Sequence, residues 1–161
     1  MRVEIAGPSD IDTLAQLNQH VQSLHLHAAP SHFKETTFET VADAYKDFLH
    51  QDGARGLIAY VEGRAVGYVL SVIRSRPENA FCPARTFVYI DQIGVDPGYQ
   101  GQGVGRGLIG AVVRYAMESG IDDIEVETWA FNTVAQGFFG SLGFEPRTIR
   151  LQMSRLMERQ S

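Results

Sequence analysis

Apolar residues recur with a helical period in the first third of the chain. Between residues 9 and 24 they lie three or four positions apart, at Ile11, Leu14, Leu17, Val21 and Leu24. Ser9 and Asp10 precede this stripe, and residues of these types commonly cap helix N-termini. Residues 37–50 repeat the pattern. The sequence therefore predicts two amphipathic helices here, preceded by a short strand at residues 3–7.

The middle of the chain carries the pattern of strands. Residues 56–73 form two apolar runs separated by Glu62, Gly63 and Arg64, which is typical of a hairpin. After a proline-containing connector, residues 85–95 predict a further strand. This region therefore contributes three strands in succession.

The last part of the chain alternates helices and strands. The pattern predicts helices at residues 105–120 and 132–143, and a strand at residues 123–130. A closing strand is predicted at residues 148–156, where Ile149, Leu151 and Met153 alternate with Thr148, Arg150 and Gln152. The predicted order is strand, two helices, three strands, helix, strand, helix, strand.

Length and composition point to one ordinary globular domain over residues 1–161. The net charge of -5 argues against a general affinity for nucleic acid or for anionic membranes. The single cysteine, Cys82, has no partner for an internal disulfide, and the first residues lack the apolar core of a signal peptide. We therefore expect a cytoplasmic protein.

Glycine is concentrated in the stretch QGQGVGRG, residues 100–107, between a predicted strand and a predicted helix. Helix N-termini have unbonded amides and a partial positive charge, which suit a phosphate. No lysine follows the glycines, so this is not a Walker loop. Gly105, Gly107 and Gly110 match a dinucleotide fingerprint, but residues 96–104 separate them from the strand. A nucleotide-dependent oxidoreductase is therefore a weak alternative.

A third pattern fits better. Gln100, Gly103 and Gly105 have the spacing Gln-x-x-Gly-x-Gly, and the segment VDPGYQGQGVGRGLI resembles the acyl-coenzyme A signature of the GNAT superfamily of N-acetyltransferases. Residues 132–146, NTVAQGFFGSLGFEP, are similar to a second block of that family. The resemblance implies an α/β fold of the α+β type. Its mixed, mainly antiparallel sheet would have six to seven strands and about four flanking helices, with a V-shaped opening between the fourth and fifth strands.

The resemblance also implies where acetyl-CoA binds. The pantetheine arm pairs with the backbone of Ile93 and Val95, while Asn132 and Phe139 contact the coenzyme. The pyrophosphate rests on the segment made of Gln100, Gly101, Gln102, Gly103, Val104, Gly105 and Arg106. Acetyl-CoA is thus the expected co-substrate.

The expected reaction is direct attack of a primary amine on the thioester in a ternary complex. An alkyl ammonium has a pKa near 10 and must lose a proton before it attacks, so a base is required. Glu125 and Glu127 lie two apart in the strand predicted at residues 123–130, and Asp91 is the only acid in the strand predicted at residues 85–95. Glu127 is the favoured base and Asp91 the alternative, against a structural role for each. A backbone amide near Ile93 would stabilise the tetrahedral intermediate.

One position departs from the family pattern. Many members protonate the leaving coenzyme thiolate with a tyrosine where this chain has Phe139. Tyr99, Ser141 or water takes that role, or the thiolate leaves unaided, because thiol pKa values lie near 8.5. Phe139 is also the argument for an alternative function, a catalytically silent acyl-CoA-binding module.

The acceptor is the least determined part of the prediction. The resemblance leaves open a small-molecule amine or a protein or peptide amine, and it allows a homodimer. We expect no metal, because His20, His25, His27 and His32 lack partner ligands at familiar spacing. These histidines are instead expected to border the acceptor groove, together with Phe33.

Overall fold

The computed structural model describes residues 1–153, and the chain divides into two compact units. The first unit, Met1–Glu127, contains β1 (Arg2–Ile5), α1 (Ile11–Ala28), α2 (Phe38–Leu49), β2 (Ala54–Val61), β3 (Arg64–Arg76), β4 (Arg85–Val95), α3 (Val104–Glu118) and β5 (Ile124–Val126). Two short 3-10 helices, η1 (Pro8–Asp10) and η2 (Pro97–Tyr99), lie between these elements. The second unit begins at Thr128 and contains α4 (Thr133–Gly140).

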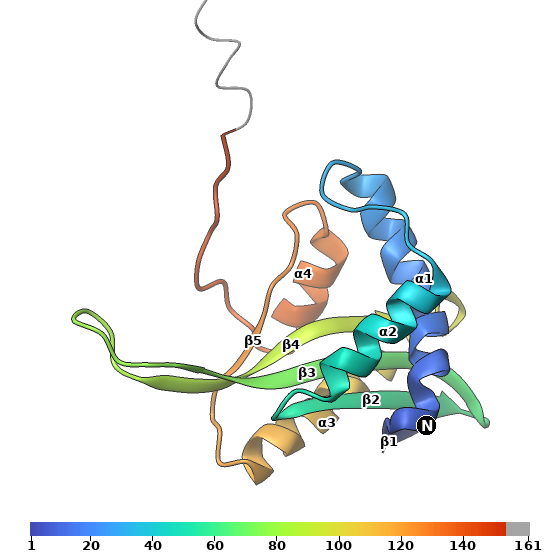
Figure 1. Ribbon diagram of the computed structural model, residues 1–161, viewed down its shortest axis with the longest axis horizontal. Coiled ribbons are helices and arrows are strands. Elements are labelled where there is room, and N and C mark those ends of the chain that lie inside the picture. The colour runs from blue at the N-terminus through green and yellow to red at the C-terminus, as the bar shows by residue number, and fades with distance from the viewer. Residues whose placement is uncertain (154–161) are drawn as a thin grey trace, which may run out of the picture. The chain divides into compact units, whose positions relative to one another are not determined.

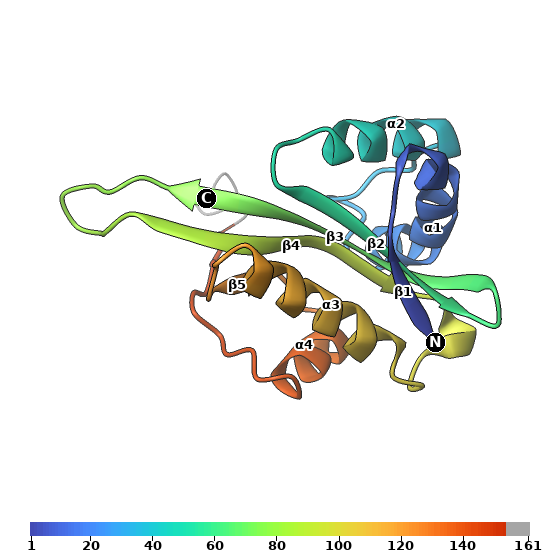
Figure 2. The same ribbon diagram turned by 90° about the horizontal axis from the view of Figure 1, so that it is seen from below.

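The first unit is built on a five-stranded sheet in the order β1-β2-β3-β4-β5 (Figure 1). Neighbouring strands are antiparallel except β4 and β5, which are parallel. Helices α1 and α2 cover one face of the sheet and α3 covers the other (Figure 2). The central strand β3 is buried without interruption from Val66 to Val72, because both of its faces are covered.

The core on the α1 and α2 side combines apolar and phenolic side chains. Its buried members are Ala6, Leu14, Tyr45, Ile58, Tyr68 and Leu70. On the opposite face, Leu108 and Val112 of α3 are fully buried. A glycine lets α1 approach β4 closely, because a Cβ on Gly94 would lie 2.6 Å from Val21 Cγ2 and 2.7 Å from Tyr68 Cε1. This close approach brings α1 directly over the C-terminal end of β4.

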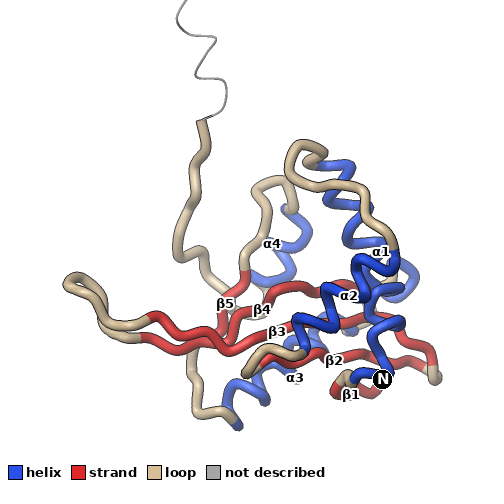
Figure 3. The backbone as a smooth tube through the Cα atoms, viewed as in Figure 1, coloured by secondary structure: helices blue, strands red, loops and turns tan. Residues whose placement is uncertain are grey.

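Most of the predicted elements are confirmed, including the hairpin in which Val61 of β2 pairs with Arg64 of β3. The sheet has five strands, so the expectation of six to seven is wrong. The closing strand is absent from the described residues 148–153, which are drawn as loop in Figure 3 and have exposed apolar side chains at Ile149, Leu151 and Met153. Residues 154–156 of that prediction lie outside the described residues. Alternation alone does not make a strand, because a strand also needs a neighbouring edge for its backbone groups.

Candidate functional site

Strand β4 extends well beyond its pairing with β5. The parallel ladder joins Val88 to Ile124, Tyr89 to Glu125 and Ile90 to Val126. Beyond Ile90, β4 continues to Val95, while β5 ends at Val126. In the described part of the chain, residues 91–95 therefore have no strand partner on the side that faces β5. This divergence lies where the V-shaped opening was predicted, between the fourth and fifth strands.

A β-bulge at Asp91 sets the direction of the backbone groups along this free edge. Leu70 of β3 pairs with Gln92 and Ser71 with Ile90, so Asp91 is the inserted residue. The Val88 N–H donates toward the β5 side, to the Asp123 carbonyl at 2.9 Å. Residues an even number of positions apart point the same way in a regular strand.

The Asp96 N–H, however, donates to the Val66 carbonyl on the β3 side, at 2.8 Å. The bulge accounts for this reversal, because one inserted residue exchanges the two sides. It therefore turns the backbone groups of Ile93 and Val95 toward the free edge. The Val95 carbonyl already accepts a bond from Gln100 Nε2 at 3.2 Å.

The Asp91 carboxylate lies close to the Arg74 guanidinium. Arg74 Nη2 lies 3.6 Å from Asp91 Oδ1, and the Arg74 guanidinium also lies 3.6 Å from the centre of the Tyr89 ring. Partial burial raises the pKa of Asp91 above its ordinary value, and the Arg74 charge opposes this rise. Asp91 is therefore a carboxylate adjusted toward the range in which a base works at neutral pH.

The two glutamates predicted near this site lie in β5 and directly after it. Arg85 of β4 forms an ion pair with Glu125 and a second one with Asp123, at 2.9 Å. Glu127 lies immediately after β5 rather than within it, and its side chain is exposed. Burial raises the pKa of Tyr89, and the Glu127 charge raises it further. Asp91 and Glu127 thus both act on the same phenol.

The glycine stretch forms the predicted loop at the start of α3. Gly101 and Gly103 have φ of 74° and 84°, in the left-handed region that favours glycine, and a Cβ on either would meet no atom within 4 Å. Gly103 is the N-cap of α3, so no side chain caps the helix. Within residues 1–153, no hydrogen-bond acceptor serves the backbone N–H groups of Gly101, Gln102, Gly103, Val104, Gly105 and Arg106. The loop therefore offers a row of open donors beside the exposed Arg106 side chain.

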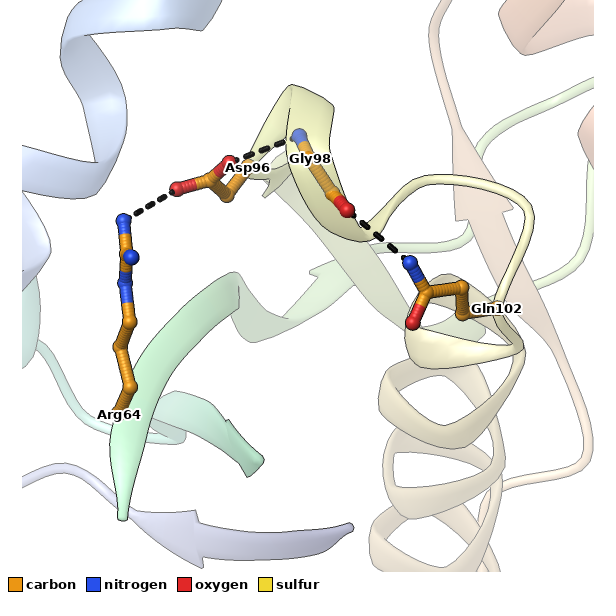
Figure 4. A network of polar contacts seen from close by, with 4 residues as sticks. All are labelled: Arg64, Asp96, Gly98 and Gln102. Carbon is orange, nitrogen blue, oxygen red and sulfur yellow. Dashed lines mark hydrogen bonds and ion pairs between the residues drawn. The ribbon is translucent and has the colours of Figure 1, made fainter. Parts of the chain in front are cut away.

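Contacts outside the glycine stretch hold this loop in place (Figure 4). Asp96 Oδ1 accepts from the Gly98 N–H at 2.9 Å, and Asp96 Oδ2 pairs with Arg64 Nη2 at 3.2 Å. Gln102 Nε2 donates to the Gly98 carbonyl at 3.0 Å. Sequence reasoning did not identify Arg64, since its approach to Asp96 depends on the β3–β4 register. The signal available for Asp96 is its position just before Pro97, which is typical of a turn-capping residue.

A cavity of about 310 Å³ lies between α1 and the segment that leads into α2. Its lining is mostly amide, hydroxyl and apolar side chains, with one carboxylate: Ala15, Asn18, Gln19, Gln22, Ser23, Leu26, Glu35, Thr36, Thr37, Phe38 and Val41. Asn18 Nδ2 also donates to Gln92 Oε1 at 3.1 Å, so the cavity wall is bonded to the residue after Asp91. The lining does not include His25 and Phe33, whose rings stack at 4.8 Å.

The second unit places the remaining predicted residues in local contacts of its own. Asn132 is the N-cap of α4, and its Oδ1 accepts from the Ala135 N–H at 3.1 Å. Phe139 is buried, with its ring 5.2 Å from those of Phe138 and Phe144. Ser141 Oγ donates to the Phe138 carbonyl at 2.7 Å. The Ser141 hydroxyl hydrogen is therefore engaged within the unit.

In residues 1–153, no three histidine, cysteine or acidic side chains are grouped so as to hold a metal ion. None of the helices in the same part of the chain has the length and apolar character needed to cross a membrane.

The sequence has known relatives. A model of the acetyltransferase (GNAT) family matches residues 18–144. The chain belongs to this family. As a GNAT protein it is an N-acetyltransferase that uses acetyl-CoA as co-substrate, which confirms the activity predicted from the two motif blocks.

Individual proteins show how far the likeness extends. Aminoglycoside N(6')-acetyltransferase type 1 of Salmonella typhimurium is 31% identical over 100 residues, which cover 62% of this chain and 68% of that enzyme. A tetramutant of the BH1408 protein from Bacillus halodurans superposes with a TM-score of 0.91 at 22% identity, covering 96% of this chain and 100% of the other. Aminoglycoside N-acetyltransferase AAC(6')-Iy in complex with CoA gives 0.71 at 21% identity, covering 96% and 99%. The two structures establish the shared fold.

Proposed function

We propose that this enzyme acetylates a primary amine of a small, polar molecule, with Asp91 as the base. The observation that carries the proposal is the continuity of β4 with the start of α3. Along this stretch, one free strand edge leads from Asp91 to the row of unbonded amides at residues 101–106. An acyl-coenzyme A that lies along this edge has its pyrophosphate at one end and its thioester near the other.

The coenzyme contacts follow from these donors. The amides at residues 101–106 and the partial positive charge of the α3 N-terminus suit a pyrophosphate, and the exposed Arg106 adds a full charge. Ile93 and Val95 offer backbone groups to the amides of the pantetheine arm, as an edge strand does. Asn132 and Phe139 stay candidates for contacts with the rest of the coenzyme.

The chemistry is a direct transfer. The Asp91 carboxylate takes a proton from the acceptor ammonium, and the neutral nitrogen attacks the thioester carbonyl carbon. The tetrahedral intermediate collapses as the carbon–sulfur bond breaks and the nitrogen releases its second proton to water, which yields the N-acetyl product and coenzyme A thiolate. Asp91 is preferred to Glu127 because it lies on the bulge itself, at the start of the free edge of β4.

The thiolate needs no acid from the second unit. Phe139 has no proton to donate, and the hydroxyl hydrogen of Ser141 is bonded to a carbonyl. Because thiol pKa values lie near 8.5, a thiolate is a competent leaving group at neutral pH and takes its proton from water. This account removes the reason for a silent binding module.

The cavity beside α1 supports a small polar acceptor. Its volume of about 310 Å³ is at the lower end of the range for small-molecule sites. Its amides and hydroxyls match hydroxyl and amine groups, and Glu35 suits a second ammonium. The aminoglycoside acetyltransferase relative supports the same class of acceptor.

The test is release of free coenzyme A thiol from acetyl-CoA, across amino sugars, aminoglycosides, polyamines and peptides with free N-termini. Calorimetric binding of acetyl-CoA is measured on the same sample. We expect amine-dependent release that is fastest with the amino sugars and aminoglycosides. Release with peptides alone would overturn the small-molecule acceptor, and absence of coenzyme binding would overturn the whole proposal.

A further inference from the structure

Four polar side chains, three of them buried and one half-buried, lie between the sheet and the two helices α1 and α2. They come from four different elements: Asn18 from α1, Tyr45 from α2, Tyr68 from β3 and Gln92 from β4. The exposed fractions of Asn18, Tyr45 and Tyr68 are 5%, 4% and 0%. We refer to these four residues as the Gln92 cluster.

The Gln92 carboxamide oxygen is the common acceptor of the cluster. It accepts from Tyr45 Oη at 2.5 Å, from Tyr68 Oη at 3.1 Å and from Asn18 Nδ2 at 3.1 Å. Asn18 Nδ2 also donates to Tyr68 Oη at 3.0 Å, and the two phenol oxygens lie 3.2 Å apart. Three elements thus converge on one atom of the fourth.

Burying such a cluster costs hydration free energy, so its presence calls for a reason other than filling space. Buried polar groups lose hydration and recover it only through their mutual bonds, whereas apolar side chains of similar size would fill the same space. Satisfied polar networks do fix geometry, because each bond restricts the orientation of both partners. The cluster is therefore expected to fix the geometry of a neighbouring part of the fold.

The part of the fold next to the cluster is the bulge of β4. Asp91 is the inserted residue of that bulge and has no partner in the register of β3, so the ladder does not hold it as it holds its neighbours. Its ion pair with Arg74 is long, at 3.6 Å, and does not fix the carboxylate by itself. Gln92 comes directly after Asp91, and its side chain is held by the three donors.

We propose that the Gln92 cluster is a positioning unit that locks the bulge of β4 and thereby orients the Asp91 carboxylate. This inference rests on the proposed role of Asp91 as the base. Tyr45, Tyr68 and Gln92 act through Asp91 and do not touch the substrate. Burial raises the pKa of both phenols, so they stay protonated hydrogen-bond donors throughout the working range of the enzyme.

The first test is Tyr68→Phe, which removes one donor to Gln92 and keeps the ring. We expect kcat to fall roughly 10- to 100-fold with little change in the KM for acetyl-CoA, as for a misplaced catalytic group. A loosened bulge admits water to Asp91, so the rising limb of the pH profile of kcat/KM should move to lower pH. The charged and titratable groups near Asp91 are Arg74, Tyr45, Tyr68 and Tyr89, and Glu127 acts on Tyr89.

Tyr115→Phe is the matched control. The Tyr115 hydroxyl donates to the Gly53 carbonyl at 2.9 Å, and Tyr115 is 7% exposed in α3, on the opposite face of the sheet. This variant should lower Tm to a similar degree but leave kcat and the pH profile unchanged. If Tyr68→Phe does not fold, Tyr45→Phe removes the other phenolic donor and is measured in its place.

Asp91→Asn in the same assay separates the two proposals. If Asp91→Asn keeps wild-type kcat, the base assignment fails. If Asp91→Asn is inactive while Tyr68→Phe matches Tyr115→Phe in kcat and in pH profile, the base stands and the positioning role is overturned. A carbon-13 NMR titration of the Asp91 carboxyl in Tyr68→Phe and wild type gives a readout besides activity, and we expect a lower pKa in the variant.

Discussion

The two ends of β4 use the same kinds of side chain in opposite ways. At its beginning, Arg85 is paired with both Asp123 and Glu125, and the strand is paired on both sides from Val88 to Ile90. At its other end, within residues 1–153, Asp91 has a single long ion pair, the edge facing β5 is free, and the amides at residues 101–106 have no acceptor. The polar groups at the Arg85 end are bonded within the protein, whereas backbone groups at the Asp91 end are available to a ligand.

This difference indicates which end is functional. Ion pairs and ladder bonds that are complete leave no capacity for a ligand, so the Arg85 end holds β4 and β5 together. The open donors are free to bond a ligand, and the partly desolvated carboxylate is in the kind of environment found at functional sites. The bulge at Asp91 lies at the boundary between the part of β4 that is paired with β5 and the part whose edge is free.

Asp91→Asn should have the largest effect, because it removes the proposed base and keeps the shape of the side chain. We expect kcat to fall roughly 10²- to 10⁴-fold, with the Kd of acetyl-CoA unchanged. Steady-state kinetics with calorimetry on the same protein measures both. Glu127→Gln is the companion variant, and a larger loss in that variant would move the base to the residue after β5.

Gly103→Glu should weaken coenzyme binding roughly 10- to 100-fold, because it places bulk and negative charge where the pyrophosphate is expected. Gly120→Glu is the matched control at the other end of α3. Gly120 also has a positive φ, 67°, and open space around its Cβ direction, so its backbone strain is similar. Calorimetry that showed equal Kd values for the two variants would rule out the loop as the pyrophosphate site.

Arg74→Met should shift the pH dependence of activity. Arg74 lowers the pKa of Asp91, so removing its charge raises that pKa further. The rising limb of kcat/KM should move about one pH unit higher, with a loss that is larger at pH 6 than at pH 9. If the rising limb of kcat/KM in Arg74→Met stays at the wild-type pH, ionisation of Asp91 does not control it.

Arg85→Met tests the other end of β4. We expect the free energy of unfolding to fall by about 1 kcal/mol, because both ion pairs to the β5 region are lost at a partly exposed site. Chemical denaturation gives this value. A kcat that fell as far as in Asp91→Asn would remove the contrast between the two ends.

The smallest effect concerns the stability of Asp91→Asn itself. The folded-state pKa of Asp91 is raised, so ionisation of Asp91 destabilises the fold as pH rises through that value. The Asn variant cannot ionise and should be slightly more stable than wild type at pH 7, with the difference vanishing near pH 3. A lower Tm for the variant at neutral pH would contradict the raised pKa.

The parts of this site that depend on local backbone conformation could be predicted from the sequence. Gly101 and Gly103 predicted a loop that the structure confirms, since left-handed backbone favours glycine. The approach of Arg74 to Asp91 and the convergence on Gln92 depend on the β3–β4 register, which one inserted residue alters. The residue types in this strand do not predict such a bulge. The alternating pattern at residues 148–153 was misleading because alternation does not supply a partner strand.

The most direct measurement is a backbone amide NMR titration with acetyl-CoA. The account predicts the largest shift changes at Ile93, Val95 and residues 101–106, and small ones at Val88 and Glu125. Equal changes at both ends of β4, or changes confined to the Arg85 end, would contradict the assignment of function to the open end.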